Sequence, residues 1–153
     1  PWGRPDMAVL KFIKNIDQKK EILVHNNGNH LRDMTYIEDC IMFIKKAINY
    51  KFKKINHSKI DLDESLGPYR IFNVARGETV RLDSLIDLIS KKLNRKPIKK
   101  LLPLQKGDVL ETLGEMSNSN LSLNYSSSIS IEEGLSNTVD WYLLNKDKIK
   151  DFI

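Results

Sequence analysis

The stretch 26–39, NNGNHLRDMTYIED, holds a basic side chain between a tight turn and the start of a helix. The Asn, Asn, Gly and Asn residues at 26–29 are turn formers. An arginine fixed in such a place, here Arg32, offers a planar fork of donors that suits a phosphate or a carboxylate. The alternative is that Arg32 pairs with Asp33 or Asp39 and only braces the fold. The residues themselves leave both interpretations open.

The spacing Tyr-x-x-x-Lys occurs twice, as Tyr50…Lys54 and Tyr142…Lys146. On a helix this spacing places both side chains on one face, and a nearby ammonium group can lower the pKa of a tyrosine. Lysine is abundant in this chain, so such matches are expected by chance, and both lie in lysine-rich surroundings. We therefore interpret both as ordinary surface pairs and predict no catalytic residue from them.

Patterns typical of metal and nucleotide binding are missing from the sequence. His25, His30 and His57 show no i, i+4 pairing and no cysteine partner, so we predict no metal site. No G-x-G-x-x-G or G-x-x-x-x-G-K stretch occurs, so the chain has no glycine loop of its own for a nucleotide. Cys40, the single cysteine, lies on an apolar helix face and is interpreted as packing. A chain that cannot form an internal disulfide suits a reducing cytoplasm.

The composition is that of a soluble globular domain, with 153 residues, 41% hydrophobic and 29% charged. A formal charge of +5, concentrated in the lysine runs at 45–59, 91–100 and 146–150, favours an anionic partner. That partner is either a nucleic acid or a phosphorylated small molecule. Aromatic residues are not interleaved with the lysines, which argues against nucleic acid. No apolar run is long enough for a membrane span, and no signal peptide opens the chain.

The elements that must position these side chains follow from apolar periodicity. It predicts four helices, which begin at Pro5, Thr35, Thr79 and Ser130. The first residues of two of them form capping-box spacings, Thr35 with Glu38 and Ser130 with Glu133. The helix expected from Thr35 to Tyr50 has a predicted buried stripe of Ile37, Ile41, Ile44, Ala47 and Ile48.

Strands and loops complete the predicted fold. We expect strands at 21–25 (EILVH) and 70–75 (RIFNVA), the second of them central, and an extended edge segment at 97–104. The polar stretches Lys51–Gly67 and Ser117–Ser128 are predicted to be loops. The fold class is therefore α/β, with about four helices and three or four short strands in a single lobe that covers 1–153.

Six blocks carry a family resemblance by their order and spacing: PWGRPDMA (1–8), VHNNGNHLRDMTYIED (24–39), PYRIFNVARGETVRLDSLIDLI (68–89), LPLQKGDV (102–109), SISIEEGL (128–135) and VDWY (139–142). The chain resembles the C-terminal, substrate-binding part of the extended short-chain dehydrogenase/reductases that act on nucleotide sugars. Within this NAD-dependent epimerase/dehydratase family it is most similar to the UDP-glucuronate 4-epimerases. The resemblance implies a Rossmann-type parent enzyme of carbohydrate metabolism in the cytoplasm.

In that family, NAD is bound by an N-terminal Rossmann domain, which also carries the catalytic Tyr-x-x-x-Lys. The resemblance places all of this upstream of Pro1, so the chain alone is expected to bind no NAD and to be catalytically silent. Strand 70–75 would extend the sheet of that domain and is expected to leave an unpaired edge here. The expected partner is a UDP-sugar, with neither nucleic acid nor membrane. The parent would be a homodimer through the absent domain, and this chain a monomer.

The resemblance also implies a set of substrate-binding residues: Arg4, Leu23, His25, Arg32, Gln105 and Asp108. Arg32 would hold the diphosphate through charge-assisted hydrogen bonds, and Arg4 would be a second contact to the substrate. Leu23 and His25 would pair with the uracil edge through their backbone groups. Gln105 and Asp108 would contact the ribose or the uridine side, although Asp108 is equally compatible with an ordinary turn residue.

The sequence departs from the family pattern in places, and two other interpretations stay open. Met34 stands where relatives usually carry Phe, and the Ser/Asn-rich run 117–128 replaces an acidic, proline-containing segment near the uridine pocket. The parent could instead be a nucleotide-sugar dehydratase or decarboxylase with the same lobe. A different class, a stand-alone basic module that binds anions without chemistry, would bind generic polyanions in a salt-dependent way. The isolated, turn-bound placement of Arg4 and Arg32, away from the lysine runs, argues against it.

Overall fold

A computed structural model describes residues 7–52 and 69–149, which form two compact units. The first unit holds the described residues of Pro1–Arg32, Thr79–Thr112 and Ser130–Ile153. The second holds those of Asp33–Glu78 and Leu113–Ile129. Each unit is described by itself below, and whether the two act as a single lobe stays a prediction. None of the helices in the described ranges has the length and apolar character that a membrane span requires.

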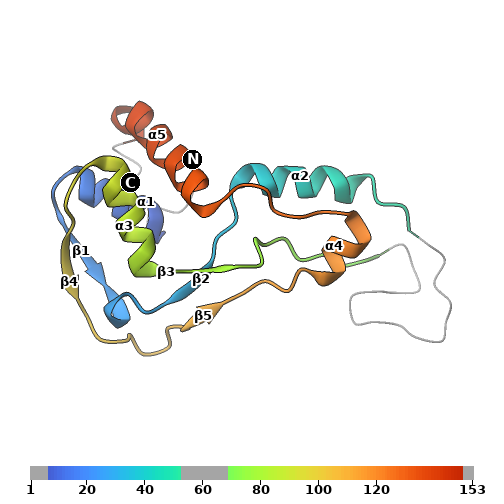
Figure 1. Ribbon diagram of the computed structural model, residues 1–153, viewed down its shortest axis with the longest axis horizontal. Coiled ribbons are helices and arrows are strands. Elements are labelled where there is room, and N and C mark those ends of the chain that lie inside the picture. Colours follow the sequence, from blue (N-terminus) through green and yellow to red (C-terminus); the bar gives the residue numbers. More distant parts are fainter. Residues whose placement is uncertain (1–6, 53–68, 150–153) are drawn as a thin grey trace. The chain divides into compact units, whose positions relative to one another are not determined.

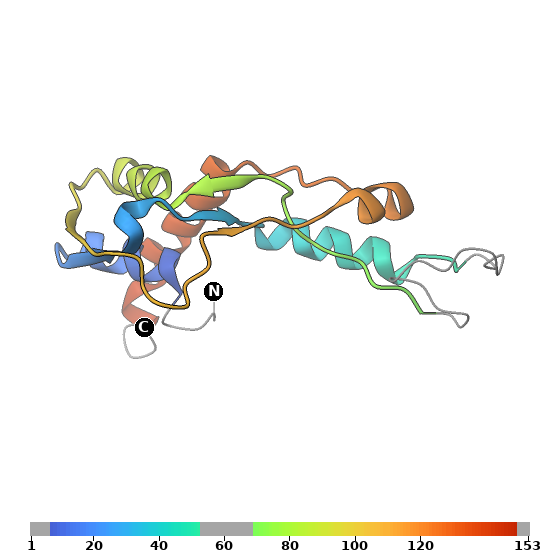
Figure 2. The same ribbon diagram turned by 90° about the horizontal axis from the view of Figure 1, so that it is seen from below.

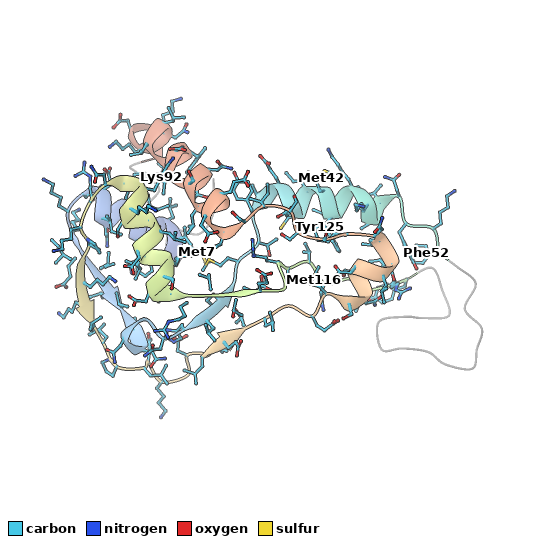
Figure 3. The ribbon with its side chains drawn as sticks, in the orientation of Figure 1. Met7, Met42, Phe52, Lys92, Met116 and Tyr125 are labelled. Carbon is cyan, nitrogen blue, oxygen red and sulfur yellow. The ribbon has the colours of Figure 1, made fainter. Side chains whose placement is uncertain are left out.

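The first unit packs three helices around a two-stranded parallel sheet (Figure 1). Its helices are α1 (Ala8–Asp17), α3 (Leu82–Leu93) and α5 (Ile131–Ile149), and the sheet pairs β1 (Glu21–Val24) with β4 (Ile98–Leu101). Helix α3 packs against both other helices, and Lys92 (labelled in Figure 3) links it to α5 through a 2.7 Å ion pair with Asp140. The buried apolar side chains are Phe12, Ile13, Ile16, Ile22, Val24, Leu85, Ile86, Ile89, Leu135, Val139, Tyr142 and Ile149.

A second, three-stranded sheet in the order β3-β2-β5 carries the candidate site. It consists of β3 (Thr79–Arg81), β2 (Leu31–Asp33) and β5 (Glu111–Thr112), and β2 pairs with β5 in parallel, Arg32 opposite Thr112. The blue β2 and green β3 lie side by side in Figure 2. The 3-10 turn η1 (His25–Gly28) precedes β2, as the sequence predicted. Gly28 has φ +80°, and a Cβ there would lie 2.9 Å from Asp83 Cβ, so the turn requires glycine.

The second unit contains α2 (Ile37–Ile48) and α4 (Ser117–Leu123) around a small aromatic core. The core consists of Phe43, Ala75, Met116, Leu123 and Tyr125, of which Met116 and Tyr125 flank α4 in Figure 3. The rings of Phe43 and Tyr125 pack edge to face, with centroids 5.1 Å apart. Edge-to-face packing is favourable for aromatic pairs.

The buried stripe predicted for α2 is wrong at its four isoleucines, whereas Ala47 is half-buried against the aromatic core. Its isoleucines are largely exposed, at 53% for Ile37, 45% for Ile41, 53% for Ile44 and 77% for Ile48, whereas Phe43 is 5% exposed. Within the second unit, α2 packs through its Phe43 face against the segments around α4, and the isoleucine face is left uncovered by the described residues. The predicted capping box at Thr35 is also wrong, since the helix begins after Tyr36 without a side-chain cap.

The exposure of this face has a measurable consequence. We expect Ile44→Ser to change the free energy of unfolding by no more than about 0.5 kcal/mol, because the substitution removes no buried contact. The matched substitution Phe43→Ser should be strongly destabilising, since it opens a cavity in the aromatic core. Urea unfolding followed by circular dichroism would measure both. A large loss in Ile44→Ser would mean that the isoleucine face is covered in solution.

Three other predicted elements differ from the structure. Helix α4 occupies 117–123, inside the predicted loop Ser117–Ser128, because Glu115 Oε1 accepts the Ser117 N–H (2.7 Å) at its start. The predicted strand 70–75 is reduced to an isolated bridge at Arg70, since a strand needs a paired neighbour. The third helix begins at Leu82 rather than Thr79, which lies in β3. The predicted loop Lys51–Gly67 falls outside the described residues from 53 onward.

The remaining elements agree with the sequence. The capping interaction at the last helix is confirmed in part, because Ser130 Oγ accepts the Glu133 N–H at 3.1 Å. The segment 97–104 contains β4, which has β1 as its partner in the two-stranded sheet. The described ranges thus form an α/β fold with one helix, α4, that the sequence did not predict.

Candidate functional site

Arg32 lies in the first unit, with its guanidinium against the segment that leads into β5. Its Nη1 donates to the carbonyl oxygens of Leu31 (2.9 Å) and Leu110 (3.2 Å). Its Nη2 donates to the carbonyl oxygen of Val109 at 2.7 Å and lies 3.5 Å from Asp108 Oδ1. The side chain is 24% exposed. Arg32 is therefore a fixed cation whose longest contact is the one to Asp108.

Asp108 and Gln105 are held beside Arg32 by a tight turn. The Asp108 N–H donates to the Gln105 carbonyl oxygen at 3.1 Å. Gly107 adopts φ +86°, a left-handed conformation that favours glycine. The Asp108 side chain is 34% exposed, so its carboxylate reaches solvent. The structure thus brings together three residues that the sequence assigned to substrate binding, Arg32, Gln105 and Asp108.

His30 is the neighbour that the sequence interpretation missed. It is 3% exposed, and its Nε2 lies 3.0 Å from Asp108 Oδ2. The N–H direction does not align with that oxygen, so Nε2 is buried without a hydrogen bond among the described residues. We considered His30 only as a metal ligand, although its i, i+2 spacing from Arg32 places both on one side of an extended segment. In the described ranges, no group of three or more His, Cys, Asp or Glu side chains could hold a metal.

The other predicted site residues lie elsewhere. Leu23, 43% exposed, is on β1 and His25 is the first residue of η1, so both belong to the β1–β4 side of the first unit rather than to the sheet of Arg32. β1 has β4 as its one partner in that sheet, which leaves its other edge unpaired within the described residues. Their predicted contact with a base stays a prediction. Arg4 falls outside the described residues.

The acidic residues proposed as alternative partners of Arg32 have other roles, within the second unit. Asp33 accepts the N–H groups of Arg76 (2.9 Å), Gly77 (2.9 Å) and Gly114 (3.1 Å). Asp39 accepts hydrogen bonds from the segment 127–129. Arg32 does brace the fold, as the alternative held, but through backbone carbonyls and Asp108.

The hydrogen bonds to Asp39 set its charge state. Burial raises its pKa, but the hydrogen bonds from Ser127, Ser128 and Ile129 outweigh burial and leave the pKa below its ordinary value. The carboxylate is therefore held in its charged form. In the motif RDMTYIED, three charged residues, Arg32, Asp33 and Asp39, each join their own segment to one distant in the sequence.

The pair Tyr142…Lys146 is a structural feature and not a catalytic couple. Burial, followed by the charge of Asp17, raises the pKa of Tyr142 to about 12, opposite to the lowering that a catalytic tyrosine needs. Lys146 Nζ is bound to Asp17 Oδ2 at 3.0 Å. For the other pair, Lys54 falls outside the described residues, and the Tyr50 hydroxyl accepts from Arg70 at 2.9 Å.

The raised pKa of Tyr142 predicts a loss of stability in alkali. The folded-state pKa is about 12, against about 10 for an unfolded tyrosine. The protonated phenol therefore stabilises the fold below pH 10, and this stabilisation is lost as the pH rises toward 12. We expect the wild type to lose more stability than Tyr142→Phe between pH 9 and pH 11.5. Urea unfolding at both pH values measures the difference. Equal losses in the two proteins would show that the phenol does not titrate as described.

Comparison with known proteins identifies the family that the chain resembles. Residues 1–62 match the model of the NAD dependent epimerase/dehydratase family. An uncharacterized protein of Methanocaldococcus jannaschii is 46% identical over 95% of this chain and 40% of its own length. The UDP-glucuronate 4-epimerase of Thermodesulfobacterium geofontis is 33% identical over 98% of this chain and 42% of its own length. The resemblance predicted from the sequence is confirmed.

The solved structures agree with this result. The UDP-glucuronic acid 4-epimerase of Bacillus cereus, in complex with UDP-glucuronic acid and NAD, superposes with a TM-score of 0.75 and 25% identity. The match covers 94% of this chain and 42% of that one. The chain thus spans about two fifths of the length of the relatives it matches. The α/β fold expected from the resemblance is confirmed.

Proposed function

We propose that this chain, which resembles the NAD-dependent epimerases over nearly all of its length, is the nucleotide-sugar-binding part of a UDP-glucuronate 4-epimerase. Relatives of that name match it over most of its residues. The observation that carries the proposal is the guanidinium of Arg32, fixed beside the solvent-reaching carboxylate of Asp108. A fixed planar cation next to an acceptor suits a diphosphate joined to a ribose.

In the proposed complex, Arg32 donates to a non-bridging oxygen of the diphosphate. The donor that can turn is the N–H of Nη2 that faces Asp108, because its 3.5 Å contact is long for a hydrogen bond. The other N–H of Nη2 donates to the Val109 carbonyl oxygen at 2.7 Å, and Nη1 donates to two further carbonyl oxygens. Once released, the Asp108 carboxylate can accept a hydroxyl hydrogen of the ribose. Gln105 lies in the same turn, where its carbonyl oxygen accepts the Asp108 N–H, and is proposed to contact the same part of the nucleotide. The chain would thus bind and orient the substrate while the sugar reacts elsewhere.

The described part of the chain does not fit NAD. A dinucleotide's pyrophosphate is held by a glycine-rich turn that leads from a strand into a helix. The strand-to-helix step at β3–α3 passes through Arg81 and Leu82, and within the described ranges no glycine-rich turn takes its place. In a 4-epimerase, a nicotinamide cofactor would supply hydride transfer at the sugar. We therefore assign this chain no part in that step beyond holding the nucleotide.

Titration calorimetry of the chain with UDP-glucuronate, UDP and inorganic phosphate tests the proposal. We expect UDP-glucuronate and UDP to bind, and phosphate to bind much more weakly. Equal, salt-sensitive binding of all three ligands would contradict the proposal and support a general anion-binding module instead. Absence of UDP binding by a folded chain would show that these residues do not form a uridine diphosphate site by themselves.

A further inference from the structure

The imidazole of His30 is the least satisfied polar group of the candidate site. Its Nε2 is buried, lies 3.0 Å from Asp108 Oδ2 and makes no aligned hydrogen bond. A buried nitrogen without a hydrogen bond is costly, so native structures rarely keep one without a reason. The carboxylate that it faces is the one bound to Arg32. A small rotation of that carboxylate would complete the missing hydrogen bond.

Asp108 therefore stands between two nitrogen groups, one for each carboxylate oxygen. Oδ1 lies 3.5 Å from Arg32 Nη2, and Oδ2 lies 3.0 Å from His30 Nε2. A phosphate that approaches Arg32 meets the negative charge of Asp108, which both repels the ligand and competes for the same guanidinium. Diphosphate binding is favoured if another group takes over the carboxylate.

We propose that His30 is a positioning residue that holds Asp108 when a nucleoside diphosphate takes Arg32, and that protonation of His30 strengthens this binding. The inference rests on the proposed function of the site and adds its regulation by pH. A protonated His30 donates to Oδ2, neutralises the carboxylate and frees for the phosphate the one N–H of Arg32 Nη2 that faces Asp108, while the other stays bound to the Val109 carbonyl oxygen. Histidine changes its charge between pH 5 and pH 8, so the affinity for the ligand falls as the pH rises across that range.

The other charged groups on the elements next to His30 either have partners of their own or are exposed. On β3, Arg81 Nη2 donates to Asn29 Oδ1 at 2.7 Å. On α3, whose Leu82 N–H donates to the His30 carbonyl oxygen, Asp83 is paired with Lys99 at 2.9 Å. Glu111 on β5 lies opposite Leu31 and is exposed. Asp108 is thus the acidic group within ion-pair distance of His30, and Arg32 the basic group that shares it.

The test measures the affinity of the chain for UDP-glucuronate between pH 5.5 and pH 8. This ligand is the right probe because neither of its phosphates has an ionisation in that range. We compare the wild type with His30→Gln, whose amide can still donate to Asp108 but carries no charge at any pH. The wild type is expected to bind up to about tenfold more tightly at the lower pH, because a positively charged His30 offsets the charge of Asp108 that repels the diphosphate, a coupling of ordinary size between two sites. His30→Gln is expected to bind with little pH dependence.

Two further variants separate positioning from a merely structural role. His57→Gln makes the same chemical change at another histidine and should keep the pH dependence of the wild type. In an Asp108→Asn background, His30→Gln should have no further effect, because the group on which His30 acts is gone. Circular dichroism checks that each variant folds.

The outcomes distinguish the two proposals. The role of His30 is wrong if the wild type binds UDP-glucuronate equally well at all pH values. It is also wrong if the affinity of His30→Gln changes with pH as much as that of the wild type. In both cases the proposed function stands. If the folded wild type binds no UDP-glucuronate at any pH, the proposed function of this chain is wrong, and the role of His30 in it falls as well.

Discussion

Arg32→Ala is expected to weaken the binding of UDP-glucuronate by about 30- to 150-fold. The guanidinium supplies charge-assisted hydrogen bonds to the diphosphate, and one such interaction contributes about 2–3 kcal/mol, with 1.4 kcal/mol for each factor of ten. Asp108 would be left without its neighbouring cation, which adds repulsion between its carboxylate and the phosphates. Calorimetric titration of the wild type and the variant measures the ratio of the two dissociation constants.

Arg32 also braces the first unit, so the loss of binding has to be separated from a loss of structure. Arg32→Lys keeps the charge but cannot span Leu31, Val109 and Asp108 with one planar fork, and we expect it to bind with intermediate affinity. Arg95→Ala is the matched control, because Arg95 is 38% exposed and pairs at 3.4 Å with Asp17, which Lys146 also holds. Its affinity should equal that of the wild type. Unchanged affinity in a folded Arg32→Ala would remove the diphosphate role from Arg32.

The sequence predicted the parts of the site that depend on local structure. The turn at 26–29, with its positive φ angles at Asn26, Asn27 and Gly28, follows from the preferences of those residues. The tight turn around Gly107 follows for the same reason. Both turns fix the direction of the segments that carry Arg32 and Asp108. Residue type and spacing therefore sufficed to select Arg32, whereas Asp108 was selected through the family resemblance.

The partners of those side chains could not be predicted, because they depend on pairing between distant segments. The parallel register of β2 and β5 places Arg32 beside residues 108–110, and no local pattern encodes that register. The proximity of His30 to Asp108 follows from the same register. Local reasoning offered Asp33 and Asp39, near in the sequence, as partners of Arg32, and both are used by segments of the second unit.

The prediction of which face of α2 is buried failed for a related reason. Apolar spacing predicts that a helix face is covered but does not say by what, and the exposed isoleucines have no partner among the described residues. The strand expected at 70–75 failed likewise, since β-forming side chains specify an extended backbone and pairing requires a second strand. Helix α4 is the opposite case, a helix formed where the residue types favour a loop. Hydrogen bonds stabilise its two ends: Glu115 accepts the Ser117 N–H, and Lys46 donates to the Asn124 carbonyl oxygen.

Loss of Asp39 is expected to destabilise the second unit strongly. It is 2% exposed, and its carboxylate accepts the N–H groups of Ser128 (3.0 Å) and Ile129 (3.1 Å) and the hydroxyl of Ser127 (2.6 Å). In Asp39→Ala both backbone N–H groups lose their acceptor, at about 1–3 kcal/mol each, so the free energy of unfolding should fall by about 2–6 kcal/mol. The serine hydroxyls can turn to other acceptors, but the backbone groups cannot.

Asp39→Asn separates the charge of this side chain from its shape. The amide keeps one acceptor oxygen, so one N–H group is orphaned and we expect about half the loss seen in Asp39→Ala. Asp140→Asn is the control, because Asp140 is 52% exposed and its ion pair with Lys92 should contribute no more than about 1 kcal/mol. Urea unfolding at pH 7 measures all three variants. A loss in Asp39→Ala no larger than that in Asp140→Asn would show that the ties to 127–129 do not hold in solution.

The lowered pKa of Asp39 adds a dependence on acid to the same prediction. Because the folded-state pKa lies below the ordinary value, the charged carboxylate stabilises the fold above about pH 4, and this contribution is lost as the pH falls through the folded-state pKa. The wild type should therefore lose more stability between pH 6 and pH 2.5 than Asp39→Asn, which has no proton to bind at this position. Equal acid sensitivity in the two proteins would show that Asp39 is not held in its charged form. A smaller loss in the variant would establish that the hydrogen bonds from 127–129, and not burial, decide the charge of this carboxylate.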